Sequence, residues 1–479
     1  MKIRYSHELI GFFILVVILC SCKKKDNAEP ELSVTPTAIT FPSEGGALDL
    51  SISCNAQWDI SNPVSSWLQA SSMSGSSGNA TIHLTTAGAN GTGSTRSGIL
   101  VINSSNGQSR RVTVSQPAVI FPSYNITPQA PVATGMSSTA SQLIAKIKLG
   151  VNIGNTLELN GIEPYPTASY ISFLKQAGFN AVRIPCGWYL HGGNNATAKI
   201  PQSWLDSVKQ VVQWCITNDM YVLLNIHWDG GWLENNVTVV KKDSVNARQK
   251  AYWEQIATAM RDLDEHLLFA SANEPGCNDN ATAAVLTSYH QTFINAVRST
   301  GGRNAYRTLV IQGNSDFINP GNYFPNDPAS NRLAFEWHNY TPSNFTILND
   351  DPPVGWGDIF FYWGAGNHTT IEPKRNSSYG EEAEQLQGFT MIKTKYIDKG
   401  IPCIMGEYST NRRNASSFYV PAELDKHNNS VDAWYTYLTK QCLTIGAKPF
   451  FWETGAVFDR HNNTVLDQRT VTAILAGAQ

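Results

Sequence analysis

Two glutamates, each at the polar end of a short apolar run, are the residues of this chain best placed to do chemistry. Glu274 ends the run LLFASANE at 267–274, directly after Asn273, and Glu407 lies in the run PCIMGEYS at 402–409. Short apolar runs of this kind indicate buried strands, and barrels and open sheets present their catalytic groups at strand ends. One such glutamate alone could be a surface residue that caps a helix. Two of the same design suggest the carboxylate pair of an enzyme that hydrolyses glycosidic bonds.

The elements that would position these glutamates alternate regularly between strand and helix from Ser138 onward. Helical stretches such as 201–219, with apolar residues near 3.6-residue spacing, separate the strands. Eight such strands over roughly 340 residues predict an α/β fold, a (β/α)8 barrel with loop insertions. The predicted strands are 149–156, 180–188, 221–228, 267–274, 308–313, 332–340, 402–409 and 448–454.

The ends of these predicted strands carry polar and aromatic side chains that would converge on one rim of the barrel. A lone histidine in a barrel is more often a core residue than a participant in chemistry. A whole set of polar and aromatic groups on one rim is hard to explain by core formation alone. Besides the two glutamates, the set comprises Arg183, His227, Asn273, His338, Tyr340 and Trp452.

With this set the chain resembles glycoside hydrolase family 5, whose pattern of Arg, His, Asn-Glu, His, Tyr, Glu and Trp it matches position by position. The likeness covers about 138–479. The segments 154–158 (GNTLE) and 227–232 (HWDGGW) look most like the endo-β-1,4-glucanases and xyloglucanases of subfamily 4. The resemblance implies a retaining, endo-acting enzyme that cleaves β-1,4-glucosidic linkages of cellulose, mixed-linkage glucan or xyloglucan.

Retaining hydrolysis by double displacement needs one carboxyl that is protonated and one that is ionised, about 5–5.5 Å apart. Glu274 is expected to be the acid/base, which protonates the glycosidic oxygen and then activates water. Glu407 is expected to be the nucleophile. Arg183 would stabilise the charged form of Glu407, and Tyr340 would donate a hydrogen bond to it.

Four further residues are expected to contact the sugar or to orient the carboxylates. Asn273 would reach the sugar 2-OH, a contact that strengthens in the transition state. His227 and His338 would bind hydroxyls or orient the carboxylates. Trp452 would form the floor of the −1 subsite.

Loops above the barrel are expected to extend this site into a cleft that suits a chain better than a closed pocket would. The connection 341–379 is unusually long, and its density of aromatic rings argues against disorder. For the tryptophans outside this loop, a place in the core is the alternative. The predicted substrate contacts are Asn155, Glu158, Trp188, Trp228, Trp232, Trp356 and Trp363.

The N-terminal residues 1–22 resemble a bacterial lipoprotein signal. A basic start and an apolar run at 11–19 lead into a cysteine motif, with Cys22 as the expected lipidated residue. An ordinary signal peptide or an uncleaved anchor is the alternative. The expected location is the outer membrane of a bacterium, reached by export and held only through the lipid.

Segment 23–118 has short alternating apolar runs between Ser-, Thr- and Gly-rich turns, which predict a small all-β sandwich. Trp58, Trp67, Arg96 and the closing VTVSQ resemble a BACON-type domain. The two tryptophans could form a sugar platform, but their strand-like context favours a place in the core. Segment 119–137 is Pro-rich and aperiodic and is predicted to be a linker before the catalytic domain at 138–479.

Composition and motifs exclude several other classes. A net charge of −3 gives no support for nucleic acid or an anionic membrane as partner. The six cysteines after Cys22 are scattered without metal-ligand spacing and are expected to be buried thiols. No nucleotide, zinc or serine-hydrolase motif occurs, so no cofactor or metal is expected. A monomer is expected, with a β-glucan polysaccharide as its partner.

Two other functions remain open. One is a mannan- or xylan-active enzyme on the same scaffold. The other is a surface glycan-binding lipoprotein that keeps the barrel but does not turn over substrate. The intact carboxylate pair weighs against the second alternative.

Overall fold

The computed structural model describes residues 29–92, 94–160, 164–348 and 355–479, so that Cys22 and the rest of the predicted signal segment lie outside the described residues. The chain divides into two compact units, Met1–Val119 and Ile120–Gln479. Each has its own hydrophobic core.

The first unit is a sandwich of two β-sheets, as the alternating runs predicted. In β3 (Ala47–Cys54), for example, Leu50, Ile52 and Cys54 are buried and the residues between them face outward. Trp58 and Trp67 are buried in the same core, so they form no exposed sugar platform. One sheet has the order β1 (Leu32–Thr35), β3 (Ala47–Cys54), β7 (Gly78–Thr86), β5 (Leu68–Ala70), and the other β2 (Ala38–Thr40), β9 (Ser109–Gln116), β8 (Arg96–Ser104), β4 (Trp58–Ser61), β6 (Ser74–Gly75).

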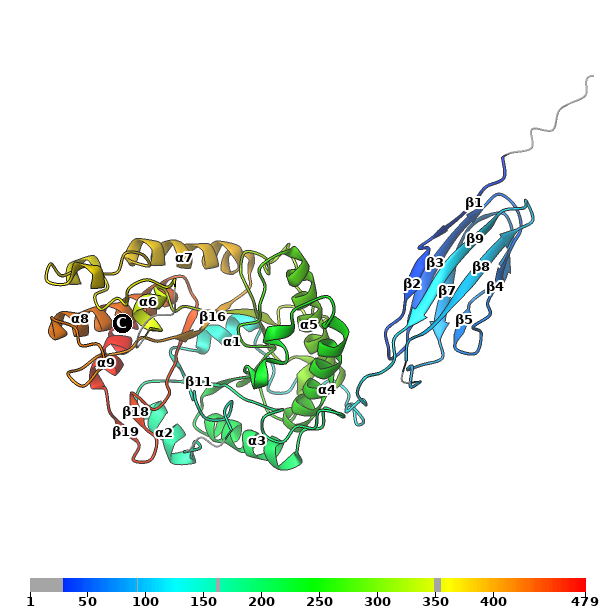
Figure 1. Cartoon of the computed structure of the whole chain (residues 1–479). Helices are drawn as coiled ribbons and strands as arrows, with labels where there is room; N and C mark the ends of the chain where they lie inside the picture. Colours follow the sequence, from blue (N-terminus) through cyan, green and yellow to red (C-terminus); the bar gives the residue numbers. More distant parts are fainter. Residues whose placement is uncertain (1–28, 93, 161–163, 349–354) are drawn as a thin grey trace, which may run out of the picture. The chain divides into compact units, whose positions relative to one another are not determined.

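The second unit contains a closed barrel of eight parallel strands, which confirms the predicted (β/α)8 fold (Figure 1). Apolar side chains such as Leu223, Leu268 and Ile404 fill the inside of the barrel, together with Leu143 and Ile144 of α1 (Ala140–Lys146). The strands are β10 (Gly150–Asn152), β11 (Ala181–Ile184), β12 (Tyr221–Asn225), β13 (Leu267–Ala270), β14 (Leu309–Gln312), β15 (Leu333–His338), β16 (Cys403–Tyr408) and β17 (Lys448–Phe451).

Helices enclose the strands (Figure 1), and apolar side chains from both pack in one core. In α3 (Gln202–Thr217), the buried residues Leu205, Val208, Val212 and Cys215 follow the helical repeat. The six described cysteines are all free and buried, as expected. The other helices are α2 (Ala168–Gln176), α3 (Gln202–Thr217), α4 (Lys242–Met260), α5 (Asn280–Ser299), α6 (Ser343–Thr346), α7 (Glu382–Lys395), α8 (Leu424–Thr444) and α9 (Gln468–Gly477), with a two-stranded sheet of β18 (Phe458–Asp459) and β19 (Thr464–Val465) before α9. Among the described helices, none combines the length and apolar character that a membrane crossing requires.

The segment predicted to be a linker is attached to the barrel unit from Ile120 onward. The buried carboxylate of Glu254 in α4 accepts hydrogen bonds from the backbone N–H groups of Tyr124 at 2.6 Å and Asn125 at 3.1 Å, and from the Ser123 hydroxyl. The Tyr124 hydroxyl also donates to the carbonyl of Thr197 at 2.7 Å. The sequence of this segment could not reveal these hydrogen bonds, because the partners Glu254 and Thr197 lie far away along the chain.

We therefore expect a chain that begins at Ile120 to be more stable than one that begins at Thr127. The shorter chain loses the three donors to Glu254, and a hydrogen bond to a charged group contributes about 1.5–3 kcal/mol to the net free energy of unfolding. Thermal unfolding of the two chains measures the difference. Equal melting temperatures would show that 120–126 contributes nothing to the barrel unit.

Candidate active site

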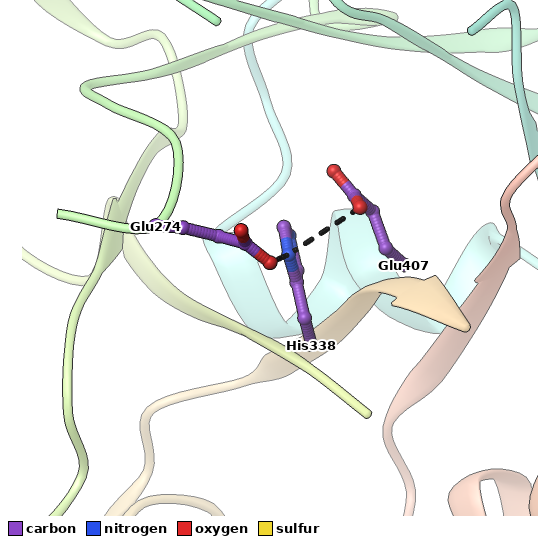
Figure 2. A group of neighbouring side chains, drawn as sticks. All are labelled: Glu274, His338 and Glu407. Carbon is purple, nitrogen blue, oxygen red and sulfur yellow. Dashed lines mark hydrogen bonds and ion pairs between the residues drawn. The ribbon is translucent and has the colours of Figure 1, made fainter. Parts of the chain in front are cut away.

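The ends of the barrel strands bring the predicted carboxylates together at one rim. A carboxylate oxygen of Glu274 and one of Glu407 lie within 4.8 Å of each other, and both are this close to a ring nitrogen of His338. Figure 2 shows His338 standing between the two glutamates. The glutamates line a cavity of about 890 Å³ together with His227, Asn273, Tyr340 and Trp452.

Glu407, near the end of β16, is buried and held at both oxygens. Arg183 Nη1 donates to Oε1 at 2.8 Å, and the Tyr340 hydroxyl donates to Oε2 at 2.9 Å. Burial and the adjacent Glu407 raise the pKa of Tyr340 well above its ordinary value, so the hydroxyl stays a donor. A carboxylate that is fixed and charge-paired in this way is equipped to act as a nucleophile.

Glu274 faces the cleft from a strained position. Its backbone φ of 48° lies in the left-handed region, which is costly for a residue with a Cβ. Its side chain is 54% exposed, and Oε1 lies 2.8 Å from His338 Nδ1. The hydrogen bond from His338 lowers the pKa of Glu274, against the opposing effect of burial. In the free protein the hydrogen bond from His338 therefore favours the ionised form of this carboxyl.

His338, the last residue of β15, is a buried imidazole surrounded by carboxylates. Burial alone would lower its pKa, but Glu407, Glu274 and Glu336 together raise it to about 9. Opposite charges 4 Å apart interact by about 4 kcal/mol at an effective dielectric constant of about 20, whereas a neutral hydrogen bond contributes about 1 kcal/mol. The ring is therefore protonated at neutral pH.

His227 and Trp452 form one wall of the cavity. Their rings lie parallel within 10°, with centroids 5.5 Å apart. Burial, Arg183 and His338 lower the pKa of His227 well below its ordinary value, so this ring is neutral. Asn273 is oriented through its Oδ1, which accepts from Arg183 Nη2 at 2.7 Å.

Sequence reasoning missed three residues that hold this site. Glu336 lies inside β15 and pairs with Arg183 Nε at 2.8 Å. Asn152 in β10 accepts from Arg183 Nη1 at 2.9 Å, and Gln312 at the end of β14 accepts the backbone N–H of Glu274. Each is a polar residue within an otherwise apolar strand, which is the signal that could have identified it.

Three of the predicted substrate contacts are buried, and their side chains are hydrogen-bonded within the fold. Trp188 is fully buried, and its ring nitrogen donates to the carbonyl of Asn225 at 3.1 Å. Trp363 is also buried and donates to the carbonyl of Gly380 at 2.7 Å. The buried carboxylate of Glu158 accepts the backbone N–H groups at 155 and 156 of its own loop.

The other predicted contacts differ in exposure. Trp232 is half-buried, and its ring nitrogen donates to the buried carboxylate of Asp229 at 3.0 Å, which gives it a structural role. Trp228 and Trp356 are 48% and 46% exposed and remain available to a ligand. Asn155 is exposed in the loop after β10. In the described part of the long loop, Phe360, Phe361 and Tyr362 are buried as well, so these rings do not line an open cleft.

A (β/α)8 barrel with two glutamates at this spacing on one rim defines the class of glycoside hydrolases. The chain belongs to the cellulase family, glycosyl hydrolase family 5. Residues 150–456 match the sequence pattern of this family. This confirms the family that the strand-end residues indicated. Residues 31–118 match the family described as viral BACON domain.

One known protein and two solved structures illustrate the likeness. A xyloglucan-specific endo-beta-1,4-glucanase of Bacteroides ovatus, BoGH5A, is 32% identical, with 97% of this chain and 96% of that protein covered. The structure of a Bacteroides ovatus family 5 xyloglucanase in complex with a XXXG heptasaccharide is 30% identical, has a TM-score of 0.67, and covers 94% of this chain and 100% of that one. A xyloglucan-specific β-1,4-glucanase from a ruminal metagenomic library, XEG5B in complex with XXLG, is 33% identical, with a TM-score of 0.64 and coverage of 71% and 96%.

The position of Trp452 can be tested through its glycine neighbour. A Cβ on Gly154 would lie 2.9 Å from the Trp452 ring and 2.9 Å from the carbonyl oxygen of Glu453. We expect Gly154→Ala to displace the ring and to lower kcat/KM by about 10- to 100-fold. Gly366→Ala is the control, since a Cβ there meets no atom within 4 Å. Equal activities of the two variants would show that Trp452 is not needed in its present place.

Proposed function

We propose that the protein is a retaining endo-β-1,4-glucanase that acts on xyloglucan by double displacement, with Glu407 as nucleophile and Glu274 as acid/base. The observation that carries this proposal is the separation of the two carboxylates, with oxygens within 4.8 Å. Retaining enzymes hold their carboxyl groups about 5–5.5 Å apart, whereas inverting enzymes leave about 6.5–9.5 Å for a water molecule.

In the first step an oxygen of Glu407 attacks the anomeric carbon while the glycosidic C–O bond breaks. The proton of Glu274 moves to the leaving oxygen, and Glu407 becomes an ester of the sugar. In the second step ionised Glu274 takes a proton from water, whose oxygen displaces Glu407 from the anomeric carbon. The lowered pKa of Glu274 in the free site suits the base role directly.

The acid role requires a protonated Glu274 when substrate is bound. A sugar over this half-exposed carboxyl removes water from it, and desolvation favours the neutral form. The proton is then released to the glycosidic oxygen as charge develops there. Trp452 and His227 would bound the −1 sugar, and Asn273 would meet its 2-OH.

Xyloglucan is proposed as the substrate because the likeness to BoGH5A extends over 97% of the chain and because both solved relatives described above are named as xyloglucanases. Beyond the carboxylates the wall of the cleft continues through Arg412, Asn428 and Asp467, with the apolar side chains of Ile347 and Leu466 exposed along it. No observation favours the mannan or xylan alternative.

Initial rates on tamarind xyloglucan, carboxymethylcellulose, barley β-glucan, mannan and xylan test the substrate. We expect the highest kcat/KM on xyloglucan, with branched oligosaccharides released from within the chain. Detection of new reducing ends together with a rapid fall in viscosity separates endo from exo cleavage. Preferred hydrolysis of mannan or xylan would contradict the proposal.

The roles of the two glutamates can be separated by chemical rescue with azide. In Glu274→Ala, an aryl glucoside or xyloglucoside with a good leaving group still forms the ester with Glu407, and azide then replaces the water that lacks a base. The product is a β-glycosyl azide. In Glu407→Ala, azide attacks the opposite face directly and gives the α-anomer.

Nuclear magnetic resonance of the azide products measures their anomeric configuration. Each variant is the control for the other, since both replace one glutamate of the same rim with alanine and only the expected anomer differs. Swapped configurations would reverse the two assignments. Full activity of either variant on polysaccharide would contradict the mechanism.

A further inference from the structure

A third carboxylate, Glu336, lies beneath the site and takes no part in the two steps above. It is fully buried, and its Oε1 is 2.8 Å from Arg183 Nε and 3.2 Å from His338 Nε2. A Cβ on Gly406 would fall 2.0 Å from the same oxygen, so the residue before Glu407 must lack a side chain. A group with no exposed surface cannot bind the sugar, and its influence must pass through its neighbours.

We propose that Glu336 is a positioning residue that keeps His338 protonated and in place, so that His338 can stabilise the negative charge that Glu274 acquires when it releases its proton. The inference rests on the roles proposed above for Glu274 and Glu407. It gives the buried ion pairs of Glu336 with Arg183 and His338 a role in proton transfer by Glu274.

Three carboxylates face the ring of His338. Nδ1 lies 2.8 Å from Glu274 and 3.6 Å from Glu407, both of which border the cleft and change their charge during the reaction. Nε2 lies 3.2 Å from Glu336, which no substrate reaches. Glu336 is therefore the one carboxylate of the three whose charge is constant throughout the cycle.

The other groups around the ring either disfavour its positive charge or are neutral. Arg183 Nη2 lies 3.4 Å from Nε2 and opposes it, and the amide nitrogen of Gln312 lies 2.8 Å from the same atom. That amide could donate to an unprotonated Nε2. A buried anion acts on the ring charge more strongly than a neutral amide does, so Glu336 selects the protonated ring. The nearby Tyr340 and His227 are neutral at working pH, as the directions of their pKa shifts require.

The charges of the site balance on both sides of the first step only when Glu336 is counted. Before the step, the cations Arg183 and His338 face the anions Glu336 and Glu407, and Glu274 carries its proton. After it, Glu407 is an ester and Glu274 is the anion, so two cations again face two anions. Without Glu336 one buried cation has no counter-charge in either state. Arginine cannot release its proton, so the imidazole must.

The test is the titration of His338 by nuclear magnetic resonance in isotope-labelled full-length protein, with His338→Asn to identify the signal. We expect the wild-type ring to be protonated at pH 7, with its pKa near 9, and to titrate at distinctly lower pH in Glu336→Gln. Glu453→Gln is the matched control, because Glu453 is an equally buried carboxylate whose ion-pair partner is Arg460. It should leave the titration of His338 unchanged, and Glu336→Asp, which keeps the charge, should restore most of it.

Activity supplies the second measurement. The ratio of kcat/KM for Glu336→Gln to that of the wild type should decrease as pH rises, reaching a loss of about 10-fold or more once the variant's His338 is neutral. A ratio that does not change with pH would indicate a merely structural residue and overturn the inference. So would a wild-type His338 that is neutral at pH 7, a result that needs no variant to fold. Inactivity of the wild type on glucans would instead contradict the proposed function and leave the titration intact.

Discussion

The guanidinium of Arg183 is the charge around which the rim of this barrel is organised. It is fully buried, and a buried charge is tolerated only when it is paired and hydrogen-bonded. Its donors reach Asn152 of β10, Asn273 after β13, Glu336 of β15 and Glu407 of β16. A single side chain thus ties together elements from both halves of the closed sheet. The positions of Glu407 and of Asn273, the residue before Glu274, follow from satisfying that one cation.

The strain in the rim is located where the chain leaves its strands to form the site. Glu274, Asn155 and Trp228 all have positive φ values, at 48°, 56° and 53°. Gly154 and Gly406 have no room for a side chain, because Trp452 and Glu336 occupy that space. The continuous core of the barrel holds these unfavourable conformations in place, since it is built from strands buried on both faces.

The sequence patterns predicted the barrel and the eight rim residues because both depend on regular signals: apolar runs of strand length and polar residues at their ends. They could not separate tryptophans that bind from tryptophans that support. Trp188 and Trp228 both lie just after a strand, yet the first is buried and the second is half exposed. Burial of a ring depends on which distant side chains lie over it, and spacing along the chain does not contain that information. Glu336 was missed for a related reason, since one charge within the run LAFEW leaves its apolar character unchanged.

Buried ion pairs of this kind are poor sources of stability, because the cost of removing charges from water offsets most of their attraction. Their value here lies in orientation. Glu336 pairs with both Arg183 and His338 beneath the site, and it holds these two cations in place next to Glu407 and Glu274. Water would have to reorient around a charge that moves between two carboxylates, whereas fixed cations already face both of them. The ordering that the reaction needs is thus completed when the chain folds, and the charge can move across the site without further rearrangement.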